Sequence, residues 1–207
     1  MTDSADGPTT DWGALYREHV DALGALAPTL TEEQLAMSVP GTPAWNVQEV
    51  LAHLAGGASD AVTGRMDGAP GPEWTSRHVG ERVHLPVAEL VAELREHQDA
   101  VAASVVDNPR PALVWNIAVH HADLHEALGL PRLPDRLWLP VAEALGPRTA
   151  ALTDSSGRPV SAYEQFRGLF SRRSRTQMQA WGTALSAEEL DELCIFGPRE
   201  DDQPVPA

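Results

Sequence analysis

The segment Pro40–Gly56, PGTPAWNVQEVLAHLAG, combines a turn with the start of a strongly patterned helix. Prolines and a glycine in its first four residues are typical of a turn, and Asn46 precedes Glu49 by three residues, as in a capping box. Apolar residues then recur at helical spacing: Val47, Val50, Leu51 and Leu54. The segment therefore predicts a helix that begins next to Asn46 and continues to about Met66.

Three other segments show the same apolar periodicity, and each is bounded by residues that typically start or end helices. One pattern starts at Asp11 and stops before Pro28, and another follows Pro86, which stands where a first-turn proline belongs. The last ends at Gly129, a residue type that commonly terminates helices. These helices are predicted over residues 11–27, 86–105 and 113–128. Together with the first helix they predict a four-helix bundle over residues 11–134.

The two ends of the chain differ from this bundle. Residues 1–10 are polar and lack periodicity, which predicts a disordered leader. Residues 135–207 predict a small C-terminal domain of mixed α+β character, so the fold class is mainly α. Its expected parts are a short helix, a hairpin around the turn SSG, two further helices and a frayed tail, at residues 137–145, 149–160, 161–181, from 186 onward and 198–207.

The composition limits the classes of function. The chain has 207 residues, 30 acidic and 15 basic, and its formal net charge of -15 argues against binding a nucleic-acid backbone. No run approaches the roughly 18 apolar residues of a membrane helix, and the start lacks signal-peptide features, so we expect a cytoplasmic protein without membrane contact. The single cysteine, Cys194, excludes an intrachain disulfide, and we expect it to be buried. All basic residues are arginine, which excludes Schiff-base catalysis by lysine.

The segment LVWNIAVHHADLHEAL, residues 113–128, is the densest in residues that carry chemistry. On a helix, Asn116, His120 and Asp123 share one face, because each lies three or four residues from the next. By the same spacing, His121 and His125 form a second pair on the opposite flank. The two pairs therefore cannot point into one pocket.

His53 is the natural partner of His120, because it flanks the apolar face of its own predicted helix and that face should turn toward the bundle interior. Imidazole nitrogens at about 2.0 to 2.1 Å suit zinc or another borderline divalent metal. A catalytic site usually has three protein ligands, and four residues are candidates for the third: Asn116, Asp123, His78 and His84. The alternative is that these histidines bond to backbone or carboxylate groups in the core or at its rim.

Two of these segments resemble signatures of a known family. PGTPAWNVQEVLAHLAG is similar to the pattern P-G-W-x-V-x-D-V-x-x-H-L-x-G of mycothiol-dependent maleylpyruvate isomerase and its DinB-like relatives, with Trp45 and His53 at matching positions. VHHADLHEALGLP resembles their element V-H-x-x-D-L-x-x-A-L-G, with His120 and Asp123 in place. Residues 70–94 resemble the connector and third helix of actinobacterial members, and LFSRRSRTQMQAW with FGPRED resembles their small C-terminal domain. The resemblance covers most of the chain.

This resemblance implies a DinB-like four-helix bundle that binds a divalent metal, commonly zinc, through a histidine of the second helix and a carboxylate-x-x-x-histidine pair of the fourth. His53 and His120 match two ligands, whereas Asn116 stands where the family has Glu or Asp and offers a neutral amide oxygen. The metal would hold the thiol of mycothiol, the implied cosubstrate, as a thiolate that attacks a small electrophile. An arginine of the family's small domain is implied to orient the substrate carboxylate, and Arg172 is its best match.

The leading hypothesis is a metal-dependent, mycothiol-using isomerase or S-transferase for a small, carboxylate-bearing substrate. Asp123 would either steady a histidine ligand or be an ordinary helix-face charge, and the run Arg172–Arg175 would alternatively lie on a solvated helix face. A second hypothesis discards the metal and makes Asn116, His120, His121 and Asp123 the acid/base set of a biosynthetic isomerase or cyclase. A third is a non-catalytic module that binds a small molecule.

Overall fold

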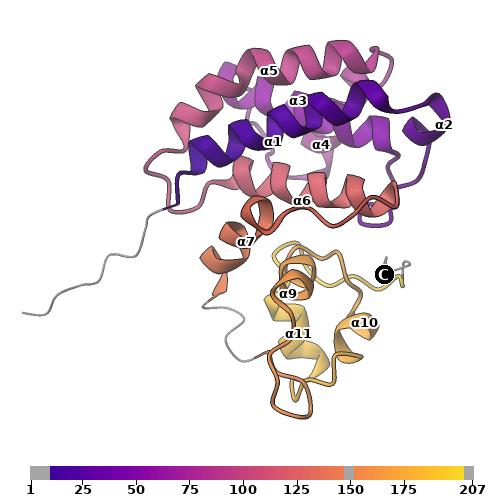
Figure 1. Ribbon diagram of the computed structural model, residues 1–207, viewed down its shortest axis with the longest axis vertical. Coiled ribbons are helices and arrows are strands. Elements are labelled where there is room, and N and C mark those ends of the chain that lie inside the picture. Colours follow the sequence, from indigo (N-terminus) through magenta and orange to yellow (C-terminus); the bar gives the residue numbers. More distant parts are fainter. Residues whose placement is uncertain (1–9, 147–151, 203–207) are drawn as a thin grey trace, which may run out of the picture.

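The computed structural model describes residues 10–146 and 152–202, and their regular secondary structure is almost entirely helical. Four of them make the bundle: α1 (Trp12–Leu26), α3 (Val47–Thr63), α5 (Val87–Ser104) and α6 (Ala112–Ala127). They lie alongside one another in the upper part of Figure 1, and the C-terminal module lies below α6. The mainly α fold class and the four bundle helices are confirmed. The predicted disordered leader lies, apart from its last residue, outside the described residues.

Side-chain caps fix where the helices that carry the bundle begin. Asp11 Oδ1 accepts a hydrogen bond from the backbone N–H of Ala14 at 2.8 Å and caps α1. At the start of α3, Asn46 Oδ1 accepts from the N–H of Glu49 at 2.9 Å, and Glu49 Oε2 accepts from the N–H of Asn46 at 2.8 Å. The predicted capping box is therefore present, and it sets the register in which α3 presents His53 to the interior.

The longest helix that the sequence does not predict in the bundle region is α4 (Pro72–Arg82). It packs against α3, and its buried residues are Trp74, His78 and Arg82 rather than aliphatic side chains. A search for aliphatic periodicity therefore misses it. The close approach of α4 to α3 requires Gly56, because a Cβ atom there would lie 2.6 Å from His78 Cβ. The short helices η1 (Ala27–Thr29) and α2 (Glu32–Leu35) complete the connection from α1 to α3.

The C-terminal module is helical among the described residues, apart from one isolated antiparallel bridge between Thr153 and Pro159. Its helices are α7 (Asp135–Ala144), α9 (Ala162–Leu169), α10 (Arg175–Gln179) and α11 (Ala187–Leu193). The bridge lies in the predicted hairpin, of which residues 149–151 are outside the described part of the chain.

The single helix predicted over residues 161–181 is wrong. α9 ends at Leu169, Ser171 takes a left-handed backbone conformation with φ of 61°, and the Ser174 side chain caps a new helix by accepting from the N–H of Gln177. Arg172 and Arg173 therefore lie in a connecting loop and not on a solvated helix face.

The hydrophobic core runs from the bundle into the module, because Phe166, Leu169 and Phe170 join the same buried cluster as the bundle side chains. Cys194 is buried in a smaller cluster, as expected. The expected frayed tail is corrected in its first half: Arg199 is buried, and its guanidinium donates to the backbone carbonyls of Pro40 and Gly41 at 2.6 and 3.4 Å. The chain thus returns to the turn before α3.

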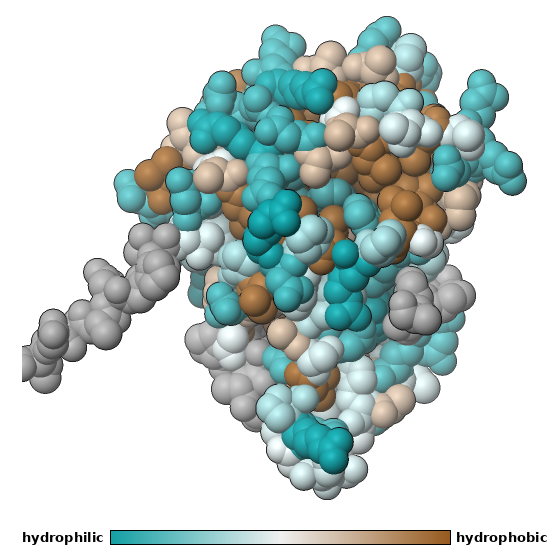
Figure 2. Space-filling view, viewed as in Figure 1, coloured by the Kyte–Doolittle hydropathy of each residue, from teal (hydrophilic) through white to brown (hydrophobic). Residues whose placement is uncertain are grey.

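The surface agrees with the acidic composition. In the space-filling view of Figure 2, hydrophilic residues cover most of the visible face, and the largest hydrophobic areas lie over the bundle. Among the described residues no helix combines the length and the apolar character that crossing a membrane requires.

Candidate functional site

Three helices bring histidine rings together inside the bundle. His53 comes from α3, His78 from α4 and His120 from α6, and all three are buried. The ring centroid of His53 lies 5.0 Å from that of His120 and 5.3 Å from that of His78. Trp45 lies against this group, with its ring centroid 4.9 Å from His53 and 6.0 Å from His120. We name His53, His78, His120 and the neighbouring Asn116 the inner cluster.

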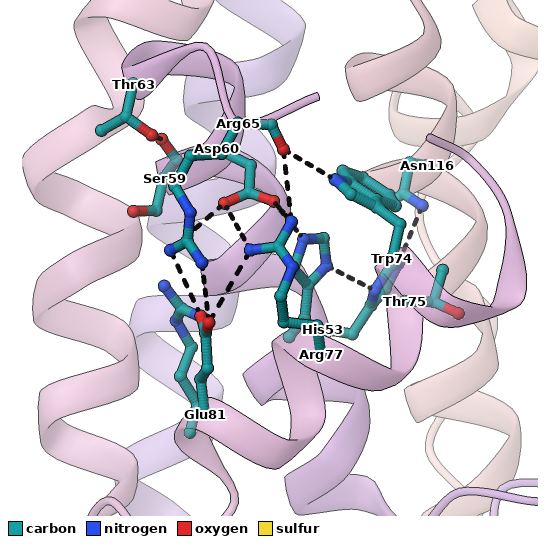
Figure 3. A network of polar contacts seen from close by, with 12 residues as sticks. His53, Ser59, Asp60, Thr63, Arg65, Trp74, Thr75, Arg77, Glu81 and Asn116 are labelled. Carbon is teal, nitrogen blue, oxygen red and sulfur yellow. Dashed lines mark hydrogen bonds and ion pairs between the residues drawn. The ribbon is translucent and has the colours of Figure 1, made fainter. Parts of the chain in front are cut away.

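A continuous line of polar contacts passes through His53. Its Nε2 lies 3.2 Å from Asn116 Nδ2, and its Nδ1 lies 3.2 Å from His78 Nδ1. On the far side of that ring, His78 Nε2 lies 2.8 Å from Asp60 Oδ2. Figure 3 shows this line running from the buried carboxylate of Asp60 to the amide of Asn116. The contacts join α3, α4 and α6.

The Asp60 carboxylate is fully buried and is held as an anion. Arg77 Nη2 donates to Asp60 Oδ2 at 2.6 Å, and Arg65 Nη1 lies 3.9 Å from Oδ1. Burial raises the pKa of Asp60, but the hydrogen bonds from Arg77 and His78 outweigh that effect, so the pKa lies below its ordinary value. One end of the polar line therefore carries a fixed negative charge.

The two histidines that face each other across α3 and α6 are neutral near pH 7. Burial lowers the pKa of His53 well below its ordinary value, and the repulsion that a protonated His53 meets from protonated His120 and His78 and from Arg172 lowers it further. Burial also lowers the pKa of His120, against the opposing effect of Asp123. Each ring therefore has one unprotonated nitrogen that can accept a proton or a hydrogen bond.

Asp123 lies next to His120 but is engaged elsewhere. Its carboxylate is fully buried, and Arg167 Nη2 and Arg172 Nη2 lie 2.5 and 2.9 Å from its oxygens. Burial raises the pKa of Asp123, and the two guanidinium groups reverse this and place it well below its ordinary value. His120 Nδ1 lies 3.0 Å from Asp123 Oδ2, yet this buried nitrogen has no partner with hydrogen-bond geometry. Gly41 packs over the carboxylate, since a Cβ atom there would lie 2.3 Å from Oδ1.

The guanidinium of Arg172 is committed to the protein by all three nitrogens. Nε and Nη2 donate to Asp123, at 3.2 and 2.9 Å, and Nη1 donates to the carbonyl of Phe170 at 2.7 Å. This fork fixes the cation beside the inner cluster. The carboxylate-orienting role of Arg172 stays a prediction.

The buried ion pairs extend to residues that sequence reasoning missed. Arg167, fully buried on α9, donates to Glu126 as well as to Asp123, and Arg173 bridges Glu126 and Glu164. Nothing in the spacing of these residues links α6 to a segment some forty positions later. The sequence does not indicate Asp60 for the same reason, and it indicates His78 only as one candidate metal ligand.

The donor set of the inner cluster does not fit a divalent cation. Both ring nitrogens of His78 are engaged, Nδ1 with His53 and Nε2 with Asp60, so the cluster offers only two imidazoles and a neutral amide, fewer than the three strong ligands of a catalytic zinc site. The carboxylate beside them, Asp123, is already neutralised by two guanidinium groups. One of these, Arg172, also exerts a positive field on both His53 and His120. Within residues 10–146 and 152–202, no group of three or more histidine, cysteine, aspartate and glutamate side chains is arranged to hold a metal ion. The expected zinc has no support in this part of the chain.

A second group of histidines lies on the other flank of α6, as the helical spacing predicts. His19 Nδ1 on α1 lies 3.0 Å from His121 Nδ1, and His19 Nε2 donates to the carbonyl of Leu137 at 2.9 Å. His125 packs against His121 with ring centroids 5.0 Å apart, and its Nδ1 donates to the carbonyl of Pro131 at 2.7 Å. We name His19, His121 and His125 the outer cluster.

The fold and the site together define a helical bundle with a histidine-lined interior and a small helical module against it. Residues 16–134, more than half of the chain, match the family described as mycothiol maleylpyruvate isomerase N-terminal domain. The chain belongs to this mycothiol-associated, isomerase-like family, and the resemblance read from its sequence is confirmed. Comparison of this chain with curated proteins and with solved structures gives no match.

Proposed function

We propose that this protein is a metal-independent, mycothiol-using isomerase or S-transferase for a small electrophilic substrate, with His53 as its general base. The main support for this proposal is the environment of His53. It is a neutral imidazole whose Nε2 lies 3.2 Å from the amide nitrogen of Asn116, beside His120 and the cation of Arg172. Family membership supports the thiol cosubstrate. The missing anionic ligand argues for activation by a side chain in place of a metal.

The chemistry follows from the position of Asn116. Its half-buried amide donates to His53 Nε2, so it marks the place that the S–H group of a bound thiol would take. The thiol proton passes to Nε2, and the sulfur electron pair forms a C–S bond to the electrophilic carbon. In an isomerisation the π electrons of the attacked double bond move onto a conjugated carbonyl of the substrate and later return, the C–S bond breaks, and the thiolate takes back the proton from His53. In an S-transfer the bond to the leaving group breaks, its electron pair departs with that group, and the proton on His53 goes to it.

The positive charge of Arg172 supports the same step. A thiolate that forms next to a buried guanidinium is stabilised, because the low dielectric strengthens their attraction. Arg172 acts here as a fixed charge, since its three nitrogens are bonded to Asp123 and Phe170. A carboxylate on the substrate would be attracted by the same charge.

The test combines metal analysis with turnover. The protein as isolated, and after exhaustive chelation, is assayed with mycothiol and a fluorogenic bimane electrophile, while its metal content is measured by elemental analysis. We expect less than stoichiometric metal, no effect of chelation, and loss of turnover in His53→Ala. Asn116→Asp is the matched control, because it restores the carboxylate expected of a metal ligand and should bind zinc more tightly than the parent.

Other results would select the competing functions. One equivalent of metal, with turnover lost on chelation and restored by zinc, would establish the metal-dependent enzyme and overturn this proposal. Binding of mycothiol without conversion of any electrophile would favour the non-catalytic module. Turnover of a substrate without any thiol would favour the acid/base isomerase or cyclase.

A further inference from the structure

The geometry points to Asp60 and His78 as positioning residues that hold His53 in the tautomer with an unprotonated Nε2. This inference rests on the proposed function, because it assigns these two buried side chains to the proton acceptor named there. Neither residue would touch the substrate, since His78 contacts His53 through Nδ1, on the side of the ring away from Asn116.

Counting protons along the line leaves a single assignment. The ionised Asp60 carboxylate can only accept, so His78 Nε2, 2.8 Å away, carries a hydrogen. A neutral His78 then has its lone pair on Nδ1, and His53 Nδ1 at 3.2 Å must be the donor. His53 Nε2 is thereby left unprotonated, and it accepts from Asn116 Nδ2. The fixed charge at one end sets the tautomer at the other.

The packing of α3 and α4 is shaped for this arrangement. His53 and Asp60 lie two turns apart on α3, and Gly56, one of the two glycines between them, leaves the space into which His78 fits. A Cβ atom at Gly56 would lie 2.6 Å from both Cβ and Cγ of His78. Trp74 packs edge-on against His78, with ring centroids 4.1 Å apart, and limits rotation of that ring. Both histidine rings are therefore held in place by neighbours.

The line also stabilises His53 after it has accepted a proton. A buried imidazolium without a partner is costly, which is why burial lowers the pKa of His53. Here its Nδ1–H donates to His78, whose Nε2–H donates to the Asp60 anion, so the new positive charge is polarised toward a negative one. Arg77 keeps that anion in position at 2.6 Å.

The first experiment reads the tautomer without any substrate. In long-range proton–nitrogen correlation spectra of the histidine-labelled full chain, His53 should be protonated at Nδ1 and bare at Nε2. Asp60→Asn should shift His53 toward Nε2 protonation, because the introduced amide can donate to His78 and reverse the line. Glu93→Gln on α5 is the matched control: it removes another carboxylate that pairs with α4, through Arg82 at 2.8 and 2.9 Å, and should leave the tautomer unchanged.

The second experiment reads turnover. Asp60→Asn should lower kcat about 100-fold or more with little change in KM, as expected when a general base is held in the wrong tautomer. His78→Gln should retain most activity, because its amide can accept from His53 and donate to Asp60, whereas His78→Leu should lose it. If Asp60→Asn does not fold, the parent spectrum and the two His78 variants still decide the matter.

The outcomes separate this inference from the proposed function. A parent His53 protonated at Nε2, or the same tautomer and kcat in Asp60→Asn and the parent, would overturn the positioning role even if mycothiol is turned over. The expected tautomers without any turnover of mycothiol would instead overturn the proposed function. Loss of activity in His78→Gln equal to that in His78→Leu would show that shape, and not hydrogen-bond polarity, is what His78 supplies.

Discussion

The inner and outer clusters lie on opposite flanks of α6 and are built from the same residue type. Each contains a pair of buried rings with their Nδ1 atoms in contact, at 3.2 Å for His53 and His78 and at 3.0 Å for His19 and His121. The difference lies in the partners at the ends. The inner line runs from a carboxylate to a side-chain amide, whereas the outer contacts end on the backbone carbonyls of Leu137 and Pro131.

This difference decides what each cluster can do. A backbone carbonyl is a neutral acceptor that does not change its charge, so His19 and His121 serve to fasten α1 and α6 to the segment that enters the C-terminal module. A buried carboxylate can balance a proton that arrives on the ring at the other end of the line. The charge of the terminal partner, more than the number of histidines, distinguishes a structural cluster from a chemical one.

The largest effect should come from exchanging one histidine in each cluster. His53→Gln should lower kcat by about 10² to 10⁴, because a positioned general base contributes that much. His121→Gln should keep kcat within a few-fold of the parent. Turnover of mycothiol and a bimane electrophile, normalised to folded protein by circular dichroism, checks this. Equal losses in both variants would show that the two clusters do not differ in role.

Acid should destabilise the outer cluster. Burial lowers the pKa of His19 from 6.5 to about 4, so below pH 6.5 the unfolded chain binds a proton that the folded chain does not. Stability is therefore full above pH 6.5 and falls as the pH drops toward 4, by about 3 kcal/mol from this residue alone. Burial and the neighbouring His19 also hold the pKa of His121 low, in the same direction. Urea unfolding between pH 7.5 and 4 measures the slope, and a flat profile would contradict this account.

Removing the contact between His19 and His121 should lower the stability of the protein but not its activity. His19→Phe leaves the Leu137 carbonyl and the His121 Nδ1 group without their partner, which should lower the free energy of unfolding at pH 7 by about 2 kcal/mol. The same variant should show a shallower loss of stability toward pH 4, because one ring whose pKa is lowered by burial is gone. Unfolding curves at both pH values check the pair of effects, with unchanged kcat as the control.

The smallest effect is expected at the edge of the outer cluster. His125 is only partly buried, and its hydrogen bond to the Pro131 carbonyl is exposed to water. His125→Ala should therefore cost less than about 1 kcal/mol in a thermal or urea unfolding measurement. A cost as large as that of His19→Phe would mean that ring number matters more than burial.

The sequence predicts the bundle well because caps and aliphatic spacing are local signals, as at Asn46 and Glu49. α4 escapes prediction because its buried side is made of Trp74, His78 and Arg82, whose burial depends on partners in other elements, such as Asp60 on α3 for His78 and Glu93 on α5 for Arg82. The C-terminal arginines were misplaced because Ser174, which caps α10, reads equally well as an interior helix residue.

The candidate site was predictable only where helix geometry sufficed. The shared face of Asn116 and His120 follows from their four-residue spacing, and both lie beside His53 in the structure. The surroundings of that face depend on tertiary contacts. Asp60 is linked to His53 only through His78, and Asp123 is neutralised by an ion pair with Arg167 of the C-terminal module. The sequence identifies which groups carry chemistry, and the fold decides which of them are free.

The ion pairs of Asp123 connect the part of the chain that matches the family to the part that does not. The stretch that matches the family ends at residue 134, yet the cations that neutralise Asp123 come from Arg167 and Arg172, beyond that limit. A fragment that ends at residue 134 would keep every bundle helix, but it would lack both guanidinium groups that pair with the Asp123 carboxylate. We therefore expect such a fragment to be less stable than the full chain.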